Sequence, residues 1–443
     1  MEFITDYKLE RYILDTKWES LPAEVQTRAR VCAIDLMTAL IVGSHGRQFQ
    51  VGLKLAENMY RPGDIALVGS DKTFSPMGAV VAMSHASNSF DIDDGHNMVK
   101  GHPGTAFIAP LLTAALEKDV DYKEFLTTLV IAYDVAVRSG KALQEHYNFL
   151  HSTGTYGAVS SAAAMGRLYG MDEKQLNNAI SIADFHAPLT PVMRAVEYPS
   201  MNKDGVPFGA FIGAEAVFET LAGETGVTST TELKEENYLL DDLGQVYECM
   251  NLYFKPYTCC RWGHQPIAAG IDLMKENNIS SDDIANVKVH TFEAATRLSK
   301  IVPHRADEAQ YNIAFPVASA LVHGDVGYLQ VTEEALDNPK VLDMMKKLEF
   351  VMDPEMEAQF PEKRLAWIEI TLKNGEVLKS RVYAAAGEHT DKVDPEWISA
   401  KFRRITKPFI AAEDQEMLIK LFLEGDLSQS IRDIVATVNS KVK

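Results

Sequence analysis

The first 250 residues read as one helix after another, which restricts the chain to a largely helical architecture. Val25, Ala29, Cys32 and Leu36 recur at helical spacing, and Gly43 follows as a stop signal. Similar apolar spacing predicts further helices at 76–90, 105–118, 122–143, 154–169, 173–185 and 206–221. Together these segments predict a large all-helical domain.

The pattern changes after about residue 265. Residues 285–292 and 366–372 alternate as strands, and Asn374-Gly375 predicts a hairpin turn into a strand at 376–383. Helices are expected near 265–276, 310–323 and 333–348, and helical spacing returns over 395–440. At 443 residues the chain is too long for one ordinary core. We therefore predict a mainly α fold with two domains: a large all-helical domain up to about residue 265 and a smaller α+β domain after it, with the C-terminal helical segment able to pack back on the first domain.

Charge and composition narrow the class of partner. The net charge of −19 disfavours nucleic acid and anionic membranes, and it requires any anionic substrate to find a locally basic pocket. No apolar run approaches the roughly 20 residues that span a bilayer. The N-terminal residues do not resemble a signal peptide, and the four cysteines form no disulfide framework. These features predict a cytoplasmic protein.

Residues 91–104 concentrate ionisable groups between helical segments. Such a density is costly to bury unless the groups pair or take part in chemistry, although a solvated acidic loop would show the same composition. A metal site is a further interpretation, but no diagnostic ligand spacing supports it. The residues that such a site would use are Asp91, Asp93, Asp94, His96 and His102.

Three segments place a basic residue immediately before a glycine-containing helix start. They are 100–105, 151–157 and 202–209. Helix N-termini expose free N–H groups that favour anions, so the three segments together would suit a molecule with several carboxylates, whereas each alone is simply a capped helix start. A fourth segment, 254–264, supplies Arg261 to clamp a carboxylate and His264 as a donor or base. Its paired cysteines are interpreted as packing residues.

In order and spacing, these motifs resemble the MmgE/PrpD family over nearly the whole chain. The similarity includes the Leu21-Pro-Ala-Glu24 helix start and segments 86–104, 151–170, 255–264 and 382–387. The resemblance implies an all-helical domain built from both chain ends, 1–265 plus 395–443, and a smaller α+β lid domain, 266–394. It further implies a homodimer and no cofactor. It also implies active-site positions at Asp91, His102, His151, Lys203 and His264.

Two positions depart from the family pattern. Family lyases often carry Thr and Trp after the Asp pair, where this chain has Gly95 and His96. A family tyrosine is replaced by Phe315, with Tyr311 nearby. These differences bear on the substrate rather than on the fold.

The resulting hypothesis is a cofactor-independent lyase or isomerase that takes a proton next to a carboxylate of a small di- or tricarboxylate. Dehydration of a 2-methylcitrate-like acid is the leading reaction, with cis-aconitate decarboxylation and iminodisuccinate epimerisation as alternatives. A non-catalytic carboxylate-binding protein is the alternative from another class. The expected catalytic residues are His102 or His151 as base and acid, Asp91 as orienting group and Lys203 as cation. The expected substrate-binding residues are Arg261, His264, His96, Lys100, Tyr311 and Tyr147.

Overall fold

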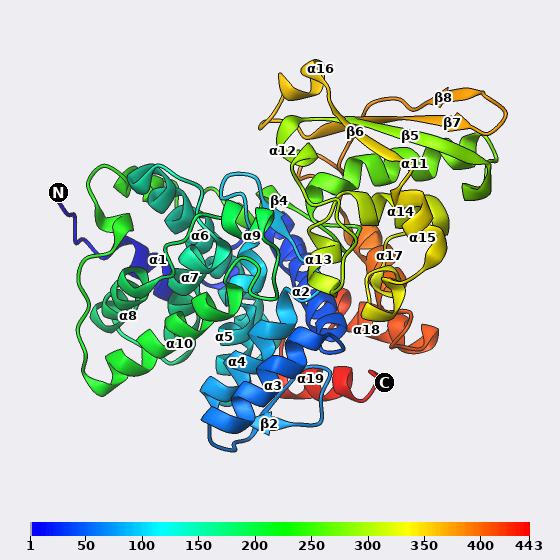
Figure 1. Ribbon diagram of the computed structural model, residues 1–443. Coiled ribbons are helices and arrows are strands. Elements are labelled where there is room, and N and C mark those ends of the chain that lie inside the picture. Colours follow the sequence, from blue (N-terminus) through cyan, green and yellow to red (C-terminus); the bar gives the residue numbers. More distant parts are fainter. Residues whose placement is uncertain (1) are drawn as a thin grey trace.

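The computed structural model describes residues 2–443, and helices dominate it (Figure 1). The first part of the chain forms helices α1 Lys8–Asp15, α2 Ala23–Gly43, α3 Arg47–Met59, α4 Pro76–Ser87, α5 Pro103–Lys118, α6 Tyr122–Tyr147, α7 Thr153–Leu168, α8 Glu173–His186, α9 Met193–Glu197 and α10 Val206–Ala222. Two short strand pairs interrupt them, β1 Ile65–Ala66 with β2 Thr73–Phe74, and β3 Gly95–His96 with β4 Leu252–Tyr253. The expected mainly helical region is confirmed.

The helix starts follow ordinary capping chemistry. The Asp121 carboxylate accepts from the backbone N–H of Glu124, and Asp172 forms a capping box with Gln175. Helices α7 and α10 approach closely because glycines face each other. A Cβ at Gly209 would lie 2.3 Å from the Gly154 carbonyl oxygen, which leaves no room for a side chain.

The second part of the chain combines a mixed sheet with helices. The helices are α11 His264–Glu276, α12 Glu293–Thr296, α13 Ala306–Gln310, α14 Ala314–His323, α15 Pro339–Met345 and α16 Pro354–Glu357. The strands are β5 Ile284–Thr291, β6 Leu348–Met352, β7 Leu365–Leu372, β8 Val377–Lys379 and β9 Tyr383–Ala384. The sheet order is β6-β5-β7-β8, with β9 also paired to β7; only β5 and β6 run parallel. This region confirms the α+β class.

Two predicted elements differ from the structure. The helix expected at 333–348 is shorter, because Pro339 opens α15 and Leu348 already begins β6. The helix expected at 310–323 divides into α13 and α14, because the Asn312 side chain accepts from the backbone N–H of Phe315 and starts a new helix. The strand expected at 376–383 is also divided, into β8 and β9.

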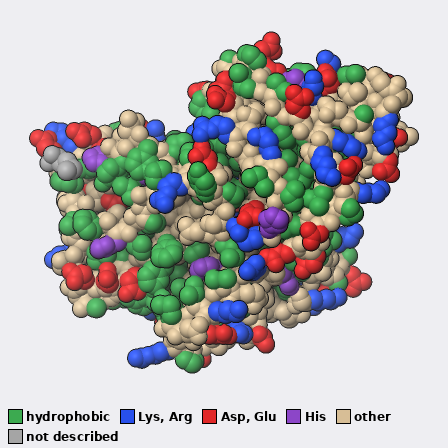
Figure 2. Space-filling model, in the orientation of Figure 1, with side chains coloured by type: hydrophobic (Ala, Val, Ile, Leu, Met, Phe, Trp, Pro, Cys, Tyr) green, Lys and Arg blue, Asp and Glu red, His purple; other side chains and the backbone are tan. Residues whose placement is uncertain are grey.

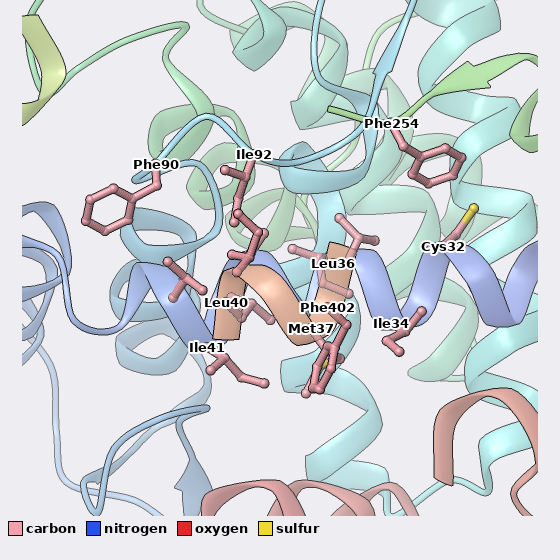
Figure 3. Close-up of a cluster of buried hydrophobic side chains, with 14 of the residues drawn as sticks. Cys32, Ile34, Leu36, Met37, Leu40, Ile41, Phe90, Ile92, Phe254 and Phe402 are labelled. Carbon is pink, nitrogen blue, oxygen red and sulfur yellow. The ribbon is translucent and has the colours of Figure 1, made fainter. Parts of the chain in front are cut away.

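The chain ends in helices α17 Pro395–Thr406, α18 Ala412–Glu424 and α19 Ile431–Asn439, and both α17 and α18 pack against α2. Figure 3 shows this core, in which Phe402 of α17 lies among Leu36, Met37 and Leu40 of α2. Segments from both ends of the sequence therefore share one core. No helix within residues 2–443 combines the length and apolar character that crossing a bilayer would take.

Candidate active site

A short strand pair brings the ionisable segment to the start of the second region. Gly95 and His96 in β3 pair antiparallel with Tyr253 and Leu252 in β4. The loop before β3 therefore lies beside Lys255. His102 is the N-cap residue of α5, and Asp204 lies just before α10. Asp91 itself has φ of 55°, a left-handed conformation that is uncommon for a residue other than glycine.

These residues open onto a cavity of about 470 Å³ between the helices and the second region. Its acidic, basic and histidine side chains are those of Asp91, Asp204, His102, Lys100, Lys255, Arg261, Arg297 and Arg364. Figure 2 shows Lys and Arg side chains on the surface below the sheet, at its junction with the helices. The cavity thus has more cationic than anionic side chains, although the whole chain is acidic.

His102 is held by a buried carboxylate. Its Nδ1 lies 2.8 Å from Oδ2 of Asp93, which is fully buried. Because a carboxylate can only accept, a hydrogen bond to Asp93 assigns the proton to Nδ1 and leaves Nε2 free to accept one. In this tautomer the nearby Lys255 ammonium acts on the ring through its charge and not through a hydrogen bond. Nε2 lies 3.7 Å from a carboxylate oxygen of Asp91 and 3.7 Å from one of Asp204. The arrangement presents an oriented imidazole to the cavity.

Lys255 supplies a buried cation behind the imidazole. Its Nζ lies 3.2 Å from Oδ1 of Asp91, 3.9 Å from Oδ1 of Asp93 and 3.0 Å from Nδ1 of His102. Although burial opposes the charged ammonium, Asp91 and Asp93 outweigh it and raise the pKa of Lys255. Lys255 therefore stays charged and helps to keep the surrounding carboxylates ionised.

The same charges set the protonation of the other groups. Burial raises the pKa of Asp93, but Lys255 and His102 more than reverse this and lower it. Burial and Lys255 lower the pKa of His102, whereas Asp93 and Asp91 raise it and prevail. Burial raises the pKa of Asp204 in spite of the opposing effect of His102. The pKa values of two nearby carboxyls, Asp93 and Asp204, are thus shifted in opposite directions. This pattern is found where one group acts as an acid and another as a base.

Asp94 supports the helix start beneath the site. One of its oxygens accepts from the backbone N–H of Gly104 at 3.0 Å, and the other accepts from the Tyr133 hydroxyl at 2.5 Å. Burial, with the nearby Asp93, raises the pKa of Asp94 to about 7. Its contacts are to helix α5 and the core, and it is not among the cavity residues.

Basic side chains form the opposite wall. Arg261 stacks over the ring of Tyr253, with 3.9 Å from the guanidinium carbon to the ring centroid, and pairs with Glu388 at 2.5 Å. Lys100 and Arg364 also line the cavity, and no carboxylate among residues 2–443 pairs with either of them within 4.0 Å. Burial, together with the Arg364 guanidinium, lowers the pKa of Lys100. Both side chains can donate hydrogen bonds to a substrate carboxylate.

Of the residues expected from the sequence, Asp91, His102, Lys100, Arg261 and Tyr311 line this cavity. The family-implied positions His151 and His264 are not among the residues that line this cavity. His151 lies 3.1 Å from the Leu143 carbonyl oxygen through Nε2, and His264 lies 2.9 Å from that of Cys259. Burial lowers the pKa of both rings.

The remaining expected residues also lie outside the cavity lining. His96 pairs with Glu248 at 3.2 Å, and Tyr147 lies in a separate surface pocket. The ammonium of Lys203 donates to the backbone carbonyls of Asn88 and Ser89 and to the side chain of Gln310. Burial lowers the pKa of Lys203 to about 8. With three protein acceptors, this ammonium holds the 88–89 turn instead of facing the cavity.

Sequence reasoning did not assign several lining residues. Lys255 is the second residue of the fourth segment, and its position before Pro256, in a segment that also holds Arg261, was an available signal. Asp204 directly follows Lys203 in the third segment. Tyr253 and Arg364 belong to none of the motifs found in the sequence. The β3–β4 pairing brings Tyr253 to the cavity, and the loop before β7 brings Arg364 there.

Three residues of the metal interpretation lie close together in the structure. Donor atoms of Asp91, Asp93 and His102 lie within 4.8 Å of one another, as do those of a second group outside the cavity, His146, Glu235 and Glu236. In the first group the Lys255 ammonium lies within 3.9 Å of both carboxylates. The chain itself supplies the cation that these carboxylates need, so the group fits a lysine-centred ion-pair cluster.

The two departures from the family pattern have structural consequences. A Cβ at Gly95 would lie 2.2 Å from Cζ of Tyr253, so the tyrosine ring fills the space that a larger residue would need. Phe315 is fully buried in α14, while Tyr311 lines the cavity. Gly95 thus places Tyr253 beneath Arg261.

Comparison with known proteins identifies the family. The MmgE/PrpD N-terminal domain matches residues 7–240, and the MmgE/PrpD C-terminal domain matches residues 257–426. Cis-aconitate decarboxylase-like protein oryM of Aspergillus oryzae is 23% identical over 98% of this chain and 97% of its own length. Cis-aconitate decarboxylase of Aspergillus terreus is 21% identical over 74% of each chain. Mitochondrial 2-methylcitrate dehydratase of Yarrowia lipolytica is 35% identical over 24% of this chain and 21% of its own. The chain belongs to the MmgE/PrpD family.

Proposed function

We propose that this protein is a lyase that moves a proton at a carbon next to a carboxylate of a small di- or tricarboxylate. The observation that carries the proposal is His102, which lines the cavity and whose Nδ1–H donates to buried Asp93 at 2.8 Å. A histidine oriented by a carboxylate is suited to general acid–base catalysis near neutral pH. The surrounding cations suit an anionic substrate.

The substrate carboxylates bind to the basic wall. Arg261, whose guanidinium is already paired with Glu388, can donate a remaining N–H to one carboxylate, and Lys100 and Arg364 hold a second. Removing a proton from the adjacent carbon builds negative charge on the bound carboxylate. These cations stabilise that charge, and they are already in place before the reaction begins.

Dehydration is the leading reaction. Nε2 of neutral His102 takes the proton from the carbon next to the carboxylate. The carbon–oxygen bond of the neighbouring hydroxyl breaks, and the hydroxyl leaves as water with a proton from Asp204. The electron pair of the broken C–H bond forms the double bond. Asp204 suits the acid role because burial raises its pKa and favours its protonated form.

Decarboxylation of a cis-aconitate-like acid is the second candidate. The specific reason is that the relatives matching most of this chain are named cis-aconitate decarboxylase or decarboxylase-like. In the same site the His102 imidazolium would donate its proton to the carbon that loses carbon dioxide. The carboxylates that raise the pKa of His102 favour this protonated form.

Proton NMR in heavy water tests the proposal. The protein is incubated separately with 2-methylcitrate, citrate, cis-aconitate and iminodisuccinate, and signals are followed for product formation and for exchange of carbon-bound hydrogen. Conversion of 2-methylcitrate to an unsaturated acid supports dehydration, and conversion of cis-aconitate to an acid that has lost one carboxyl group supports the second candidate. Binding of these acids without exchange or product would contradict a catalytic role.

A further inference from the structure

The cavity has two chemically different walls. Beside the ionisable groups described above, the cavity is lined by apolar side chains from separate segments of the chain. Six of them form what we call the apolar wall: Leu150, Val192, Met193, Val196, Trp262 and Phe360. A citrate-sized molecule offers only carboxylates and hydroxyls, which gain nothing from such a surface.

The apolar wall rests on packed structure. The ring of Trp262 meets Phe292 edge-on at 5.8 Å and Phe360 at 6.2 Å, and Phe292 stacks on Phe360 at 4.5 Å. Trp262, Phe360 and Val196 all pack against a buried cluster that includes Phe292 and Ile313. Because this support is buried, the wall is a built part of the site.

The apolar wall is also continuous with the carboxylate-binding groups. Cys260, Arg261 and Trp262 are consecutive in sequence, and all three line the cavity. A carboxylate held by Arg261 would place its neighbouring carbon atoms near Trp262. A substituent on that carbon would meet the apolar wall.

We propose that the substrate is a di- or tricarboxylate bearing an alkyl chain of several carbons, with its carboxylates on the basic groups and its chain on the apolar wall. This inference rests on the proposed function and narrows its substrate class. Burying each added methylene should improve binding by up to about fourfold, until the chain outgrows the cavity.

Titration calorimetry with unreactive dicarboxylates tests it on the whole protein. The series is succinate, methylsuccinate, butylsuccinate and hexylsuccinate. We expect butylsuccinate to bind at least about tenfold more tightly than succinate. Equal or falling affinity along the series would overturn the alkyl-chain inference while leaving carboxylate binding intact. Absence of binding by every member would instead contradict the proposed function, and the inference with it.

A paired variant locates the effect. Met193→Gln with Val196→Thr keeps side-chain size but makes two half-buried positions on the wall polar. The affinity ratio of butylsuccinate to succinate should shrink at least about threefold, with succinate binding unchanged. The control, Leu189→Gln with Val227→Thr, makes the same kind of change in a separate surface pocket and should leave the ratio unaltered. An unchanged ratio in the wall variant would also overturn the inference.

Discussion

Replacing Lys255 by Met should move the pH dependence of turnover upward. The ammonium lies 3.0 Å from Nδ1 of His102 and lowers the pKa of that ring. Met keeps an unbranched side chain but carries no charge. The variant therefore removes the cation while leaving the Asp93 carboxylate, which acts in the opposite direction.

The size of the shift follows from the distance. Two unit charges 3.0 Å apart interact by about 1.4 kcal/mol even at the dielectric constant of water, and by more when buried. This energy equals about one pKa unit. The limb of the kcat/KM profile that reports His102 should thus move to higher pH by at least about one pH unit. Stability should also fall by about 3–5 kcal/mol, because Asp91 and Asp93 lose their buried partner.

The assay measures kcat/KM between about pH 5 and 9, with thermal unfolding to check that each variant folds. Lys401→Met is the matched control. Lys401 is also buried and pairs with Asp35 at 2.5 Å, but it does not line the cavity. It should lose comparable stability without moving the profile. A Lys255→Met profile that stays in place or moves to lower pH would refute the reasoning.

Three further predictions use other groups. Asp93→Asn removes a charge that raises the pKa of His102, so its pH profile should move downward and turnover should fall at least about a hundredfold; an unchanged rate would count against the orienting role. Burial raises the pKa of Asp134 from 3.8 to about 7, so its stabilising contribution is full below about pH 4 and is lost as pH rises through 7. Relative to Asp134→Asn, the wild type should lose up to about 4 kcal/mol of unfolding free energy over this range, and parallel denaturant-derived curves would contradict this. Phe185, Tyr198 and Phe208 are 68%, 79% and 62% exposed, and we expect them to lie in a homodimer interface; a monomer mass by light scattering would show otherwise.

Strong periodicity made most of the fold predictable. The segment 122–143 predicted nearly all of α6, and 366–372 matched β7 within one residue. The errors lie where a local signal competed with the pattern. Asn312 ends one helix and starts another through its own side chain, and 348–352 pairs with β5 as a short strand that lacks clear alternation.

The site was less predictable because it depends on the orientation of individual side chains, which the sequence pattern does not show. His102, His151 and His264 each stand at or near a helix start, yet only His102 points into the cavity. The other two rings contact backbone carbonyls within their own neighbourhood, a choice that residue spacing does not reveal. Lys255 and Asp204 reach His102 only through tertiary packing.

Hydrogen exchange in His102→Gln tests the central claim most directly. The wild type, His102→Gln and His151→Gln are incubated in heavy water with the carboxylate that the wild type turns over, and deuterium uptake at carbon is followed by NMR. The account predicts at least about a hundredfold slower exchange in His102→Gln, with substrate binding largely retained, and near wild-type exchange in His151→Gln. Exchange at the wild-type rate in His102→Gln, or its loss in His151→Gln alone, would contradict the assignment of His102 as the group that moves the proton.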